Sequence, residues 1–498
     1  MAHSTLRSRL GCWLALMGMA LWLTACRPLT IPMPTAAVPG TAPALAPGPV
    51  AGAAGLDDPL YPTLGNGGYD VLHYDIDLTV DVAGNTLNGA TTISARATQA
   101  LSAFNLDFSG LTIGQVTVNG APARYRRQAS ELTITPVQPV QADSLLTVTV
   151  AYQGQPQPMR DPGVPFLPLG WQRFGDDIAV VSEPSGAMTW FPSNNHPLDK
   201  ATFTMRLTVP KPYQAAANGV LSDTQDNGSS TTYVWQMTDP MATYLATVHI
   251  GRYEVITAAG PDGVVRRDYF PLGTPASVKA SFAPIPQMMQ FMRQRIGPYP
   301  FAAYGVALLP VPTGWALETQ TLSTFGAGAG GAAWDEGEVM HELAHEWFGN
   351  SVSPATWQDV WLNEGFATYF QWLWQEQNEG SAAFNATVQE VYASMLAQDV
   401  GSPLPQQPPD LFTDATYQRG AWTLHALRLT VGDVVFFKIL RAYYQRFAGS
   451  HASTADFIAT AVEVSGQPAV ETLLRDWLTN PKLPAPPAPS AQTPVIAL

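Results

Sequence analysis

Charged residues are scarce in this sequence of 498 residues. Asp, Glu, Lys and Arg together make up 13% of the chain, about half of their share in an ordinary soluble protein. Acidic residues outnumber basic ones, which gives a formal net charge of −14. Because nucleic-acid binding needs a basic face, nucleic acid is not an expected partner. An acidic protein is compatible with a peptide that carries a free ammonium group.

Cysteine is also rare, and the two that occur are Cys12 and Cys26. A short basic region precedes an apolar stretch, residues 10–23, that is too short to span a bilayer comfortably. The Leu-Thr-Ala-Cys sequence that ends at Cys26 resembles the lipobox of a bacterial lipoprotein signal. It predicts a signal peptide over residues 1–25 and a lipid on the Cys26 sulfur, which would anchor the protein outside the cytoplasm. The alternatives are a secretion signal cleaved after Ala25 and an uncleaved membrane anchor.

A lipidated Cys26 would leave the mature chain without a free thiol or a disulfide, so that the fold would depend on its core and a metal. Residues 26–57 are rich in Pro, Ala and Gly and are predicted to form a semi-extended tether. Residues 481–498 are a second Pro/Ala-rich stretch, predicted to be a disordered tail. The hydrophobic content of 46% is sufficient for two or three domains with their own cores.

The hydrophobic pattern divides the remaining chain into two domains. Over residues 58–257, apolar and polar residues alternate with a period of two, which predicts half-buried strands and an all-β domain. Such a domain alone would suit an adhesive or spacer module. Residues 258–480 combine a mostly helical stretch (278–296), strand-like segments (304–309 and 317–322) and a long helical region, which predicts an α+β domain.

The sequence His-Glu-Leu-Ala-His at residues 341–345 has the pattern of a metal site. On a helix, His341 and His345 point from one face, and Glu342 lies beside them as a candidate general base. Two His cannot complete a tetrahedral zinc shell, which needs a third protein ligand and an open position. Glu364 is the candidate, because a helix–loop–helix hairpin would return it to the two His and a carboxylate in an apolar helix needs a cation. The alternative is a buried His pair without metal.

Together these residues resemble the gluzincin aminopeptidases, the family of aminopeptidase N and leukotriene hydrolase. The resemblance runs from about residue 69 to residue 484, nearly the whole predicted mature chain. It is carried by His-Glu-Leu-Ala-His at 341–345, Trp-Phe-Gly-Asn at 347–350, Trp-Leu-Asn-Glu-Gly-Phe-Ala at 361–367, Ala-Leu-Glu-Thr at 316–319, Tyr-Gln-Arg-Gly-Ala at 417–421, and Glu-Pro at 183–184 before Trp-Phe-Pro at 190–192.

The resemblance implies one Zn²⁺ per chain, bound by His341, His345 and Glu364. It makes Glu342 the general base, which takes a proton from the attacking water and passes it to the leaving amine. Tyr417 matches the tyrosine that donates a hydrogen bond to the oxyanion in this family.

The resemblance also implies a site for the free α-amino group of a peptide. Glu318 matches the glutamate of the family's substrate-binding strand, with Ala316 and Leu317 beside it, and Glu183 matches a second anchor. The strand departs from the family pattern where Leu317 replaces Met and Thr319 stands where Asn is usual. Two further departures are Met188, where many members have Arg, and Glu346, where Gln is frequent.

The implied fold is an N-terminal all-β, saddle-like domain followed by a thermolysin-like α+β zinc metallopeptidase domain with closing helices, in a short form without the C-terminal helical domain. The expected function is a zinc aminopeptidase acting on peptides with a free N-terminus. A zinc endopeptidase of the same fold and a non-catalytic surface peptide-binding lipoprotein are the alternatives. None of these motifs encodes the oligomeric state.

Overall fold

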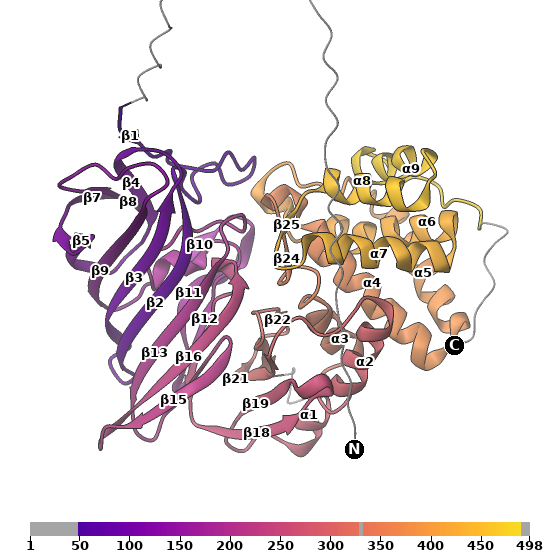
Figure 1. Cartoon of the computed structure of the whole chain (residues 1–498). Coiled ribbons are helices and arrows are strands. Elements are labelled where there is room, and N and C mark those ends of the chain that lie inside the picture. The colour runs from indigo at the N-terminus through magenta and orange to yellow at the C-terminus, as the bar shows by residue number, and fades with distance from the viewer. Residues whose placement is uncertain (1–47, 328–331, 490–498) are drawn as a thin grey trace, which may run out of the picture. The chain divides into compact units, whose positions relative to one another are not determined.

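The computed structural model describes residues 48–327 and 332–489. Cys26, the predicted signal peptide and most of the predicted tether lie outside the described residues. From Gly48 onward the chain forms one compact unit, in which an all-β domain precedes an α+β domain (Figure 1). Within the described ranges, no helix is long and apolar enough to cross a membrane.

The all-β domain is built around an eight-stranded sheet with two smaller sheets beside it. The large sheet has the order β15 (Val220–Asp226), β16 (Ser230–Met241), β13 (Ala201–Pro210), β2 (Tyr69–Asp81), β3 (Thr86–Ala97), β9 (Leu145–Gly154), β5 (Thr112–Val118) and β6 (Ala121–Pro122). A second sheet has the order β1 (Val50–Ala51), β4 (Leu101–Asp107), β8 (Glu131–Thr135) and β7 (Arg124–Gln128). The third has the order β10 (Met159–Asp161), β11 (Val164–Phe174), β12 (Asp177–Val181), β17 (Val248–Gly251) and β14 (Gln214–Ala217).

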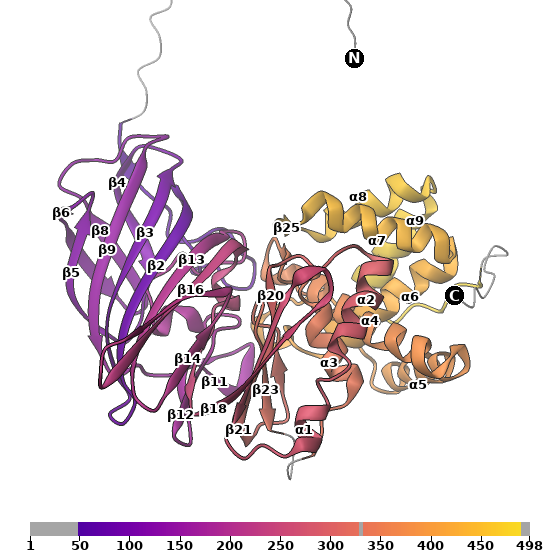
Figure 2. The ribbon, with the colours of Figure 1, turned by 60° about the horizontal axis from the view of Figure 1, so that its bottom comes forward.

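The α+β domain begins with a mixed sheet and continues into helices (Figure 2). The sheet has the order β18 (Tyr253–Ala259), β19 (Val265–Pro271), β21 (Val306–Pro312), β23 (Ser323–Ala327) and β22 (Ala316–Leu317), with β20 (Ala303–Tyr304) paired to β19. The α-helices are α1 (Ala276–Ala280), α2 (Ile285–Arg295), α3 (Glu336–Ala344), α4 (Trp361–Glu379), α5 (Ser381–Ala397), α6 (Gly420–Val431), α7 (Asp433–Phe447), α8 (Thr454–Ser465) and α9 (Ala469–Thr479). A short parallel pair joins β24 (Val352–Pro354) to β25 (Ser450–Ala452).

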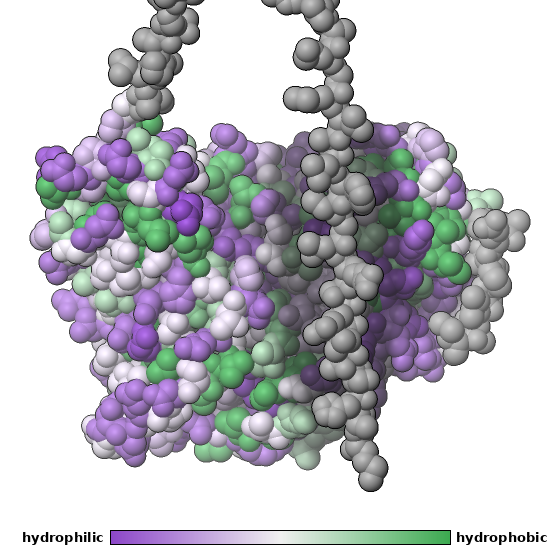
Figure 3. All heavy atoms as spheres, in the orientation of Figure 1, coloured by the Kyte–Doolittle hydropathy of each residue, from purple (hydrophilic) through white to green (hydrophobic). Residues whose placement is uncertain are grey.

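The predicted period-two alternation is confirmed in the central strands of the large sheet. In β2, the side chains of Tyr74, Ile76 and Leu78 are fully buried, while their neighbours are exposed or half-buried. Successive side chains point to opposite faces of a strand, so one face of β2 packs into the core. On the outside, apolar residues are scattered among polar ones over the face shown in Figure 3, as the low content of charged residues suggests.

Two segments of the α+β domain differ from the expectation. The helix predicted over residues 278–296 is divided into α1 and α2, because Pro284 and Pro286 start a new helix there. The strand predicted over residues 317–322 is wrong beyond Leu317, where β22 ends. The chain then turns, and Thr321 adopts a φ of 66°, a left-handed conformation that a strand does not allow.

Packing also changes the predicted ends of the domains. Val50–Ala51, expected in the tether, form β1 beside β4. Tyr253 begins β18 of the mixed sheet in the α+β domain, so the all-β domain ends before the predicted residue 257. The start of the Pro-rich tail is packed rather than disordered, because Pro484 is buried and its carbonyl accepts a hydrogen bond from the Tyr392 hydroxyl at 3.0 Å. The composition of these Pro-rich segments does not indicate which part of the folded domains they pack against.

A lysine of the all-β domain joins the two domains close to the metal motif. The Lys200 ammonium donates to the carbonyl oxygens of Asn350 (2.7 Å), Ser351 (2.9 Å) and Ser450 (3.3 Å). Two of these carbonyls follow the helix that carries the His pair, and the third belongs to β25. Charge-assisted hydrogen bonds are stronger than neutral ones, so this contact holds the loop after α3 against the all-β domain.

We expect Lys200→Met to lower the melting temperature by a few degrees, as measured by differential scanning calorimetry. Three carbonyls lose a charged donor, a loss of about 2 kcal/mol. Lys211→Met is the matched control, because Lys211 makes an exposed ion pair with Asp226, and such pairs contribute little. Equal effects of the two substitutions would contradict the joining role of Lys200.

Candidate active site

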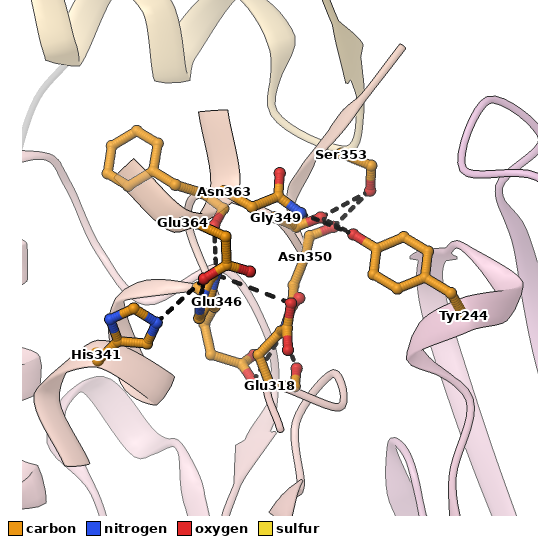
Figure 4. Close-up of polar contacts among 11 residues, drawn as sticks. Tyr244, Glu318, His341, Glu346, Gly349, Asn350, Ser353, Asn363 and Glu364 are labelled. Carbon is orange, nitrogen blue, oxygen red and sulfur yellow. Dashed lines mark hydrogen bonds and ion pairs between the residues drawn. The ribbon is translucent and has the colours of Figure 1, made fainter. Parts of the chain in front are cut away.

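The two histidines and Glu364 meet as the sequence predicts. α3 begins at an Asp335 N-cap, whose side chain accepts a hydrogen bond from the Gly337 amide, and it presents His341 and His345 one turn apart. α4 packs against α3 and carries Glu364 in its first turn. Glu364 Oε2 lies 3.3 Å from His341 Nε2 and 3.5 Å from His345 Nε2, as the close-up in Figure 4 shows for His341.

This donor set fits a zinc ion. With zinc–ligand distances of about 2.0–2.1 Å, the donors of a tetrahedral site lie about 3.4 Å apart, close to the two distances above. His345 Nδ1 lies 3.1 Å from the carbonyl oxygen of Phe348. A backbone carbonyl can only accept, so Nδ1 carries the proton and Nε2 is free to bind a metal. All three residues are buried.

The cavity around these ligands contains an excess of buried negative charge. Glu183 Oε1, Glu318 Oε1 and Glu342 Oε2 are buried and have no hydrogen-bond partner among the described residues. None of the described residues that line the cavity is Lys or Arg. Buried carboxylates without partners are costly, so this arrangement calls for cations from outside the chain.

The pKa shifts of the cavity have the same origin. Burial and the nearby Glu318 carboxylate raise the pKa of Glu183 well above the usual value. Burial likewise raises the pKa of Glu342, and the negative charges of Glu318 and Glu364 add to this effect. Burial opposes a charged His345, yet Glu318 and Glu364 raise its pKa to about 10. The carboxylates therefore stabilise positive charge at this point.

Tyr417 reaches the same cavity from a short π-helical segment, Ala415–Arg419, that precedes α6. Its ring is stacked on the imidazole of His341, with centroids 6.0 Å apart and planes 17° apart. Such π-helical turns are frequent at functional sites. Burial raises the pKa of Tyr417 well above its usual value, so the phenol keeps its proton and can donate a hydrogen bond.

A glycine contact brings Tyr417 close to Glu364. A Cβ added at Gly365 would lie 2.7 Å from the backbone carbon of Gly420, and one at Gly420 would lie 3.0 Å from the Gly365 Cα. Neither position leaves room for a side chain. The backbones of α4 and α6 therefore approach directly, one residue after Glu364 and three residues after Tyr417.

Glu183 and Glu318 come from different domains and meet beside the metal ligands. Glu183 follows β12 of the all-β domain, and Glu318 follows β22 of the other domain. Both are buried, at 5% and 3% exposure. One carboxylate oxygen of each lies within 4.8 Å of the other and of one from Glu364.

The cavity also has an apolar wall that the sequence does not predict. Ala316 and Leu317 line it as predicted, but so do seven further residues: Val164, Phe166, Leu167, Leu169, Val181, Trp315 and Phe412. Most of these lie on β11, which reaches the cavity from the all-β domain. Phe166 is 70% exposed, and the residues around it do not alternate between apolar and polar. Only the packing of the two domains shows that Phe166 lines the cavity.

Comparison with known proteins identifies the family. The profile of the Peptidase M1 N-terminal domain matches residues 71–245, and that of the Peptidase family M1 domain matches residues 334–477. The crystal structure of an M1 zinc metallopeptidase from Deinococcus radiodurans is 34% identical to the chain, covers 88% of this chain and 100% of that chain, and superposes with a TM-score of 0.82. The chain belongs to peptidase family M1. The expected fold class is thereby confirmed, and zinc is the metal of the M1 metallopeptidases.

Curated M1 relatives are longer. Aminopeptidase M1-A from Oryza sativa subsp. japonica is 27% identical over 447 residues, which are 81% of this chain and 49% of the rice protein. Aminopeptidase N from Streptomyces lividans is 25% identical over 450 residues, 82% of this chain and 50% of that protein. The chain thus spans about half the length of the curated M1 relatives that it matches.

We expect Glu364→Ala to lower the zinc content of the purified protein at least about tenfold, measured by plasma mass spectrometry after dialysis, because the variant loses one of three ligands. Glu342→Gln is the matched control. Glu342 lies in the same cavity without belonging to the three-ligand set, so its variant should keep one zinc per chain. Zinc retained by Glu364→Ala, or lost from both variants, would contradict the ligand assignment.

Proposed function

We propose that the chain is a zinc-dependent aminopeptidase that hydrolyses the first peptide bond of peptides with a free N-terminus. The observation that carries this proposal is the pair Glu183 and Glu318. Both are buried beside the metal ligands, and each has one carboxylate oxygen without a hydrogen-bond partner among the described residues. A protonated α-amino group would supply the charge and the hydrogen bonds that these oxygens lack.

The relatives support the same function. The rice and Streptomyces proteins are named aminopeptidases, and a variant of the Deinococcus enzyme was crystallised with the substrate Tyr-Ser-Ala. A metallopeptidase that anchors the amine at a fixed distance from the metal cleaves one residue from the end. An endopeptidase would need an open channel on both sides of the metal, with no charged group at the position of the amine.

In the proposed mechanism, His341, His345 and Glu364 hold the zinc. When bound, zinc would supply Lewis acidity, which would polarise a carbonyl oxygen and lower the pKa of the attacking water. Glu342 accepts the proton of the attacking water and delivers it to the leaving amine. The Tyr417 hydroxyl donates a hydrogen bond to the negative charge that develops on the carbonyl oxygen. Glu183 and Glu318 hold the α-amino group, so that the first peptide bond lies at Glu342.

We expect Glu318→Ala to lower kcat/KM for a free aminoacyl 4-nitroanilide by about 30-fold, because it removes a charge-assisted hydrogen bond of about 2 kcal/mol. Hydrolysis of the N-acetylated peptide analogue should be unchanged. Glu471→Ala, which alters an exposed glutamate of α9, is the control and should change neither rate.

Other outcomes of the same assay separate the alternatives. An endopeptidase would be favoured if Glu318→Ala lost kcat/KM equally on free and N-acetylated substrates. It would also be favoured if the wild-type protein cleaved only blocked peptides. A wild-type protein that binds zinc and hydrolyses neither substrate would favour a non-catalytic binding protein. An active Glu342→Gln variant would contradict the assigned general base.

We also propose that the mature protein is attached outside the cytoplasm through a lipid on Cys26. The proposal rests on the lipobox-like Leu-Thr-Ala-Cys sequence after a short apolar stretch. A lipid anchor would place the active site where extracellular or periplasmic peptides are available.

Cys26→Ser should move the protein from the detergent phase to the aqueous phase in a Triton X-114 partition of expressing cells, because the acyl chains are lost. Cys12→Ser is the matched control and should partition as the wild type does. A Cys26→Ser protein that stays in the detergent phase would favour an uncleaved membrane anchor.

A further inference from the structure

Glu346 is a fully buried carboxylate that has no role in the mechanism above. It follows the metal ligand His345 directly, and its side chain is bonded to groups outside the cavity. Glu346 Oε1 accepts hydrogen bonds from the Thr321 amide at 2.9 Å and from Asn350 Nδ2 at 3.3 Å. Its other oxygen, Oε2, accepts one from the Tyr299 hydroxyl at 2.8 Å. Figure 4 shows Glu346 and Asn350 beside Glu318.

The first connection from Glu346 to Glu318 passes through one amide group. Asn350 Nδ2 has two hydrogens, and it also donates to the backbone carbonyl oxygen of Glu318 at 2.6 Å. The same nitrogen therefore joins the Glu346 carboxylate to the backbone of the residue proposed to bind the amine.

The second connection is the turn that begins at Glu318. Thr321 has a φ of 66°, and a left-handed conformation is costly for a β-branched residue, by about 1–3 kcal/mol. Two hydrogen bonds hold it there: its amide donates to Glu346, and its hydroxyl accepts from the Gly219 amide at 2.8 Å. Without the Glu346 acceptor, the Thr321 amide loses its partner, and the turn keeps only the Gly219 contact of Thr321, the Asn218 contact of Gln320 and the hydrogen bonds between Thr319 and Leu322.

Glu318 depends on this backbone support because its side chain is otherwise poorly held. Glu318 Oε1 has no hydrogen-bond partner within the described chain, and its approach to His345 Nδ1 is long, at 4.0 Å. The position of the carboxylate is therefore set mainly by the backbone from which it projects.

We infer that Glu346 is a positioning residue for Glu318: it holds the turn at residues 318–321 so that the Glu318 carboxylate meets Glu183 and the α-amino group of the substrate. This inference rests on the proposed aminopeptidase function. It assigns a second task to the buried turn that follows α3, which is to set the distance between the amine and the scissile bond.

The geometry also predicts that Gln can replace Glu at this position. A Gln side chain has an oxygen for the Thr321 amide and Asn350, and an N–H group for the Tyr299 oxygen. The Tyr299 hydroxyl also lies 3.0 Å from the Ala303 carbonyl oxygen, to which it can donate while it accepts from Gln. Glu346→Gln therefore keeps every connection, whereas Glu346→Leu keeps the volume and removes them all.

The test compares these two variants on a free aminoacyl 4-nitroanilide and on the N-acetylated peptide analogue. Glu346→Leu should raise KM for the free-amine substrate about tenfold with little change in kcat, and should leave the blocked substrate unaffected, because ground-state binding of the amine is lost. Glu346→Gln should stay within about twofold of the wild type on both substrates. Zinc content should be unchanged in both variants.

Two further variants guard against a loss of folding. Tyr299→Phe removes a single donor to Glu346 and keeps the ring, so it should shift KM in the same direction by a smaller factor. Glu376→Leu is the matched control, because Glu376 is a partly buried glutamate of α4 paired with Arg428 and should not change the selectivity for free amines.

The outcomes separate this inference from the proposed function. A wild type with no preference for the free amine would overturn the function and the inference together. A wild type with that preference, retained by Glu346→Leu and Tyr299→Phe, would overturn the inference alone. A third outcome is that Glu346→Gln loses as much selectivity for free amines as Glu346→Leu does. That result would show that the charge of Glu346 is required rather than its hydrogen bonds, and it would also overturn the inference.

Discussion

The structure depends on one electrostatic constraint, the burial of four glutamate carboxylates in a cavity that the described chain lines without Lys or Arg. Glu364 has the two imidazoles as partners, and Glu183, Glu318 and Glu342 each leave an oxygen unpaired. Burial of like charges is unfavourable unless cations accompany them. A protein can retain such a cluster when a metal ion and a ligand ammonium supply the missing charge. The site is therefore suited to cations because the fold leaves the negative charge of these buried carboxylates uncompensated.

Rigid local contacts make this cluster possible. The backbone contact at Gly365 and Gly420 brings two helices together, and the turn at Thr321 is held by a buried carboxylate and by the other domain. These contacts surround the carboxylates with groups that cannot move away from one another. Repulsion that would otherwise separate the acids is thus opposed by packing.

The predictable and unpredictable parts of the site differ in how far apart their residues lie in the sequence. The positions of His341 and His345 follow from helical spacing, and Glu364 follows from the requirement for a third ligand. The two carboxylates proposed to bind the amine, Glu183 and Glu318, were identified only by family resemblance, because Glu183 lies in another domain. The Thr321 turn, the Phe166 wall and the packed Pro484 depend on contacts between distant segments, for which local periodicity carries no signal. The strand predicted over residues 317–322 is wrong at this turn, because Thr is a common strand residue and the local sequence gives no sign of the left-handed conformation of Thr321.

The division of the carboxylates between two domains has a consequence for the timing of activity. Glu183 is synthesised long before the metal motif, and it joins the other acids only when the second domain has folded against the first. A chain that is still being synthesised holds Glu183 without Glu318. The cluster of carboxylates is therefore completed only by the final docking of the two domains, so the proposed site forms only when folding ends.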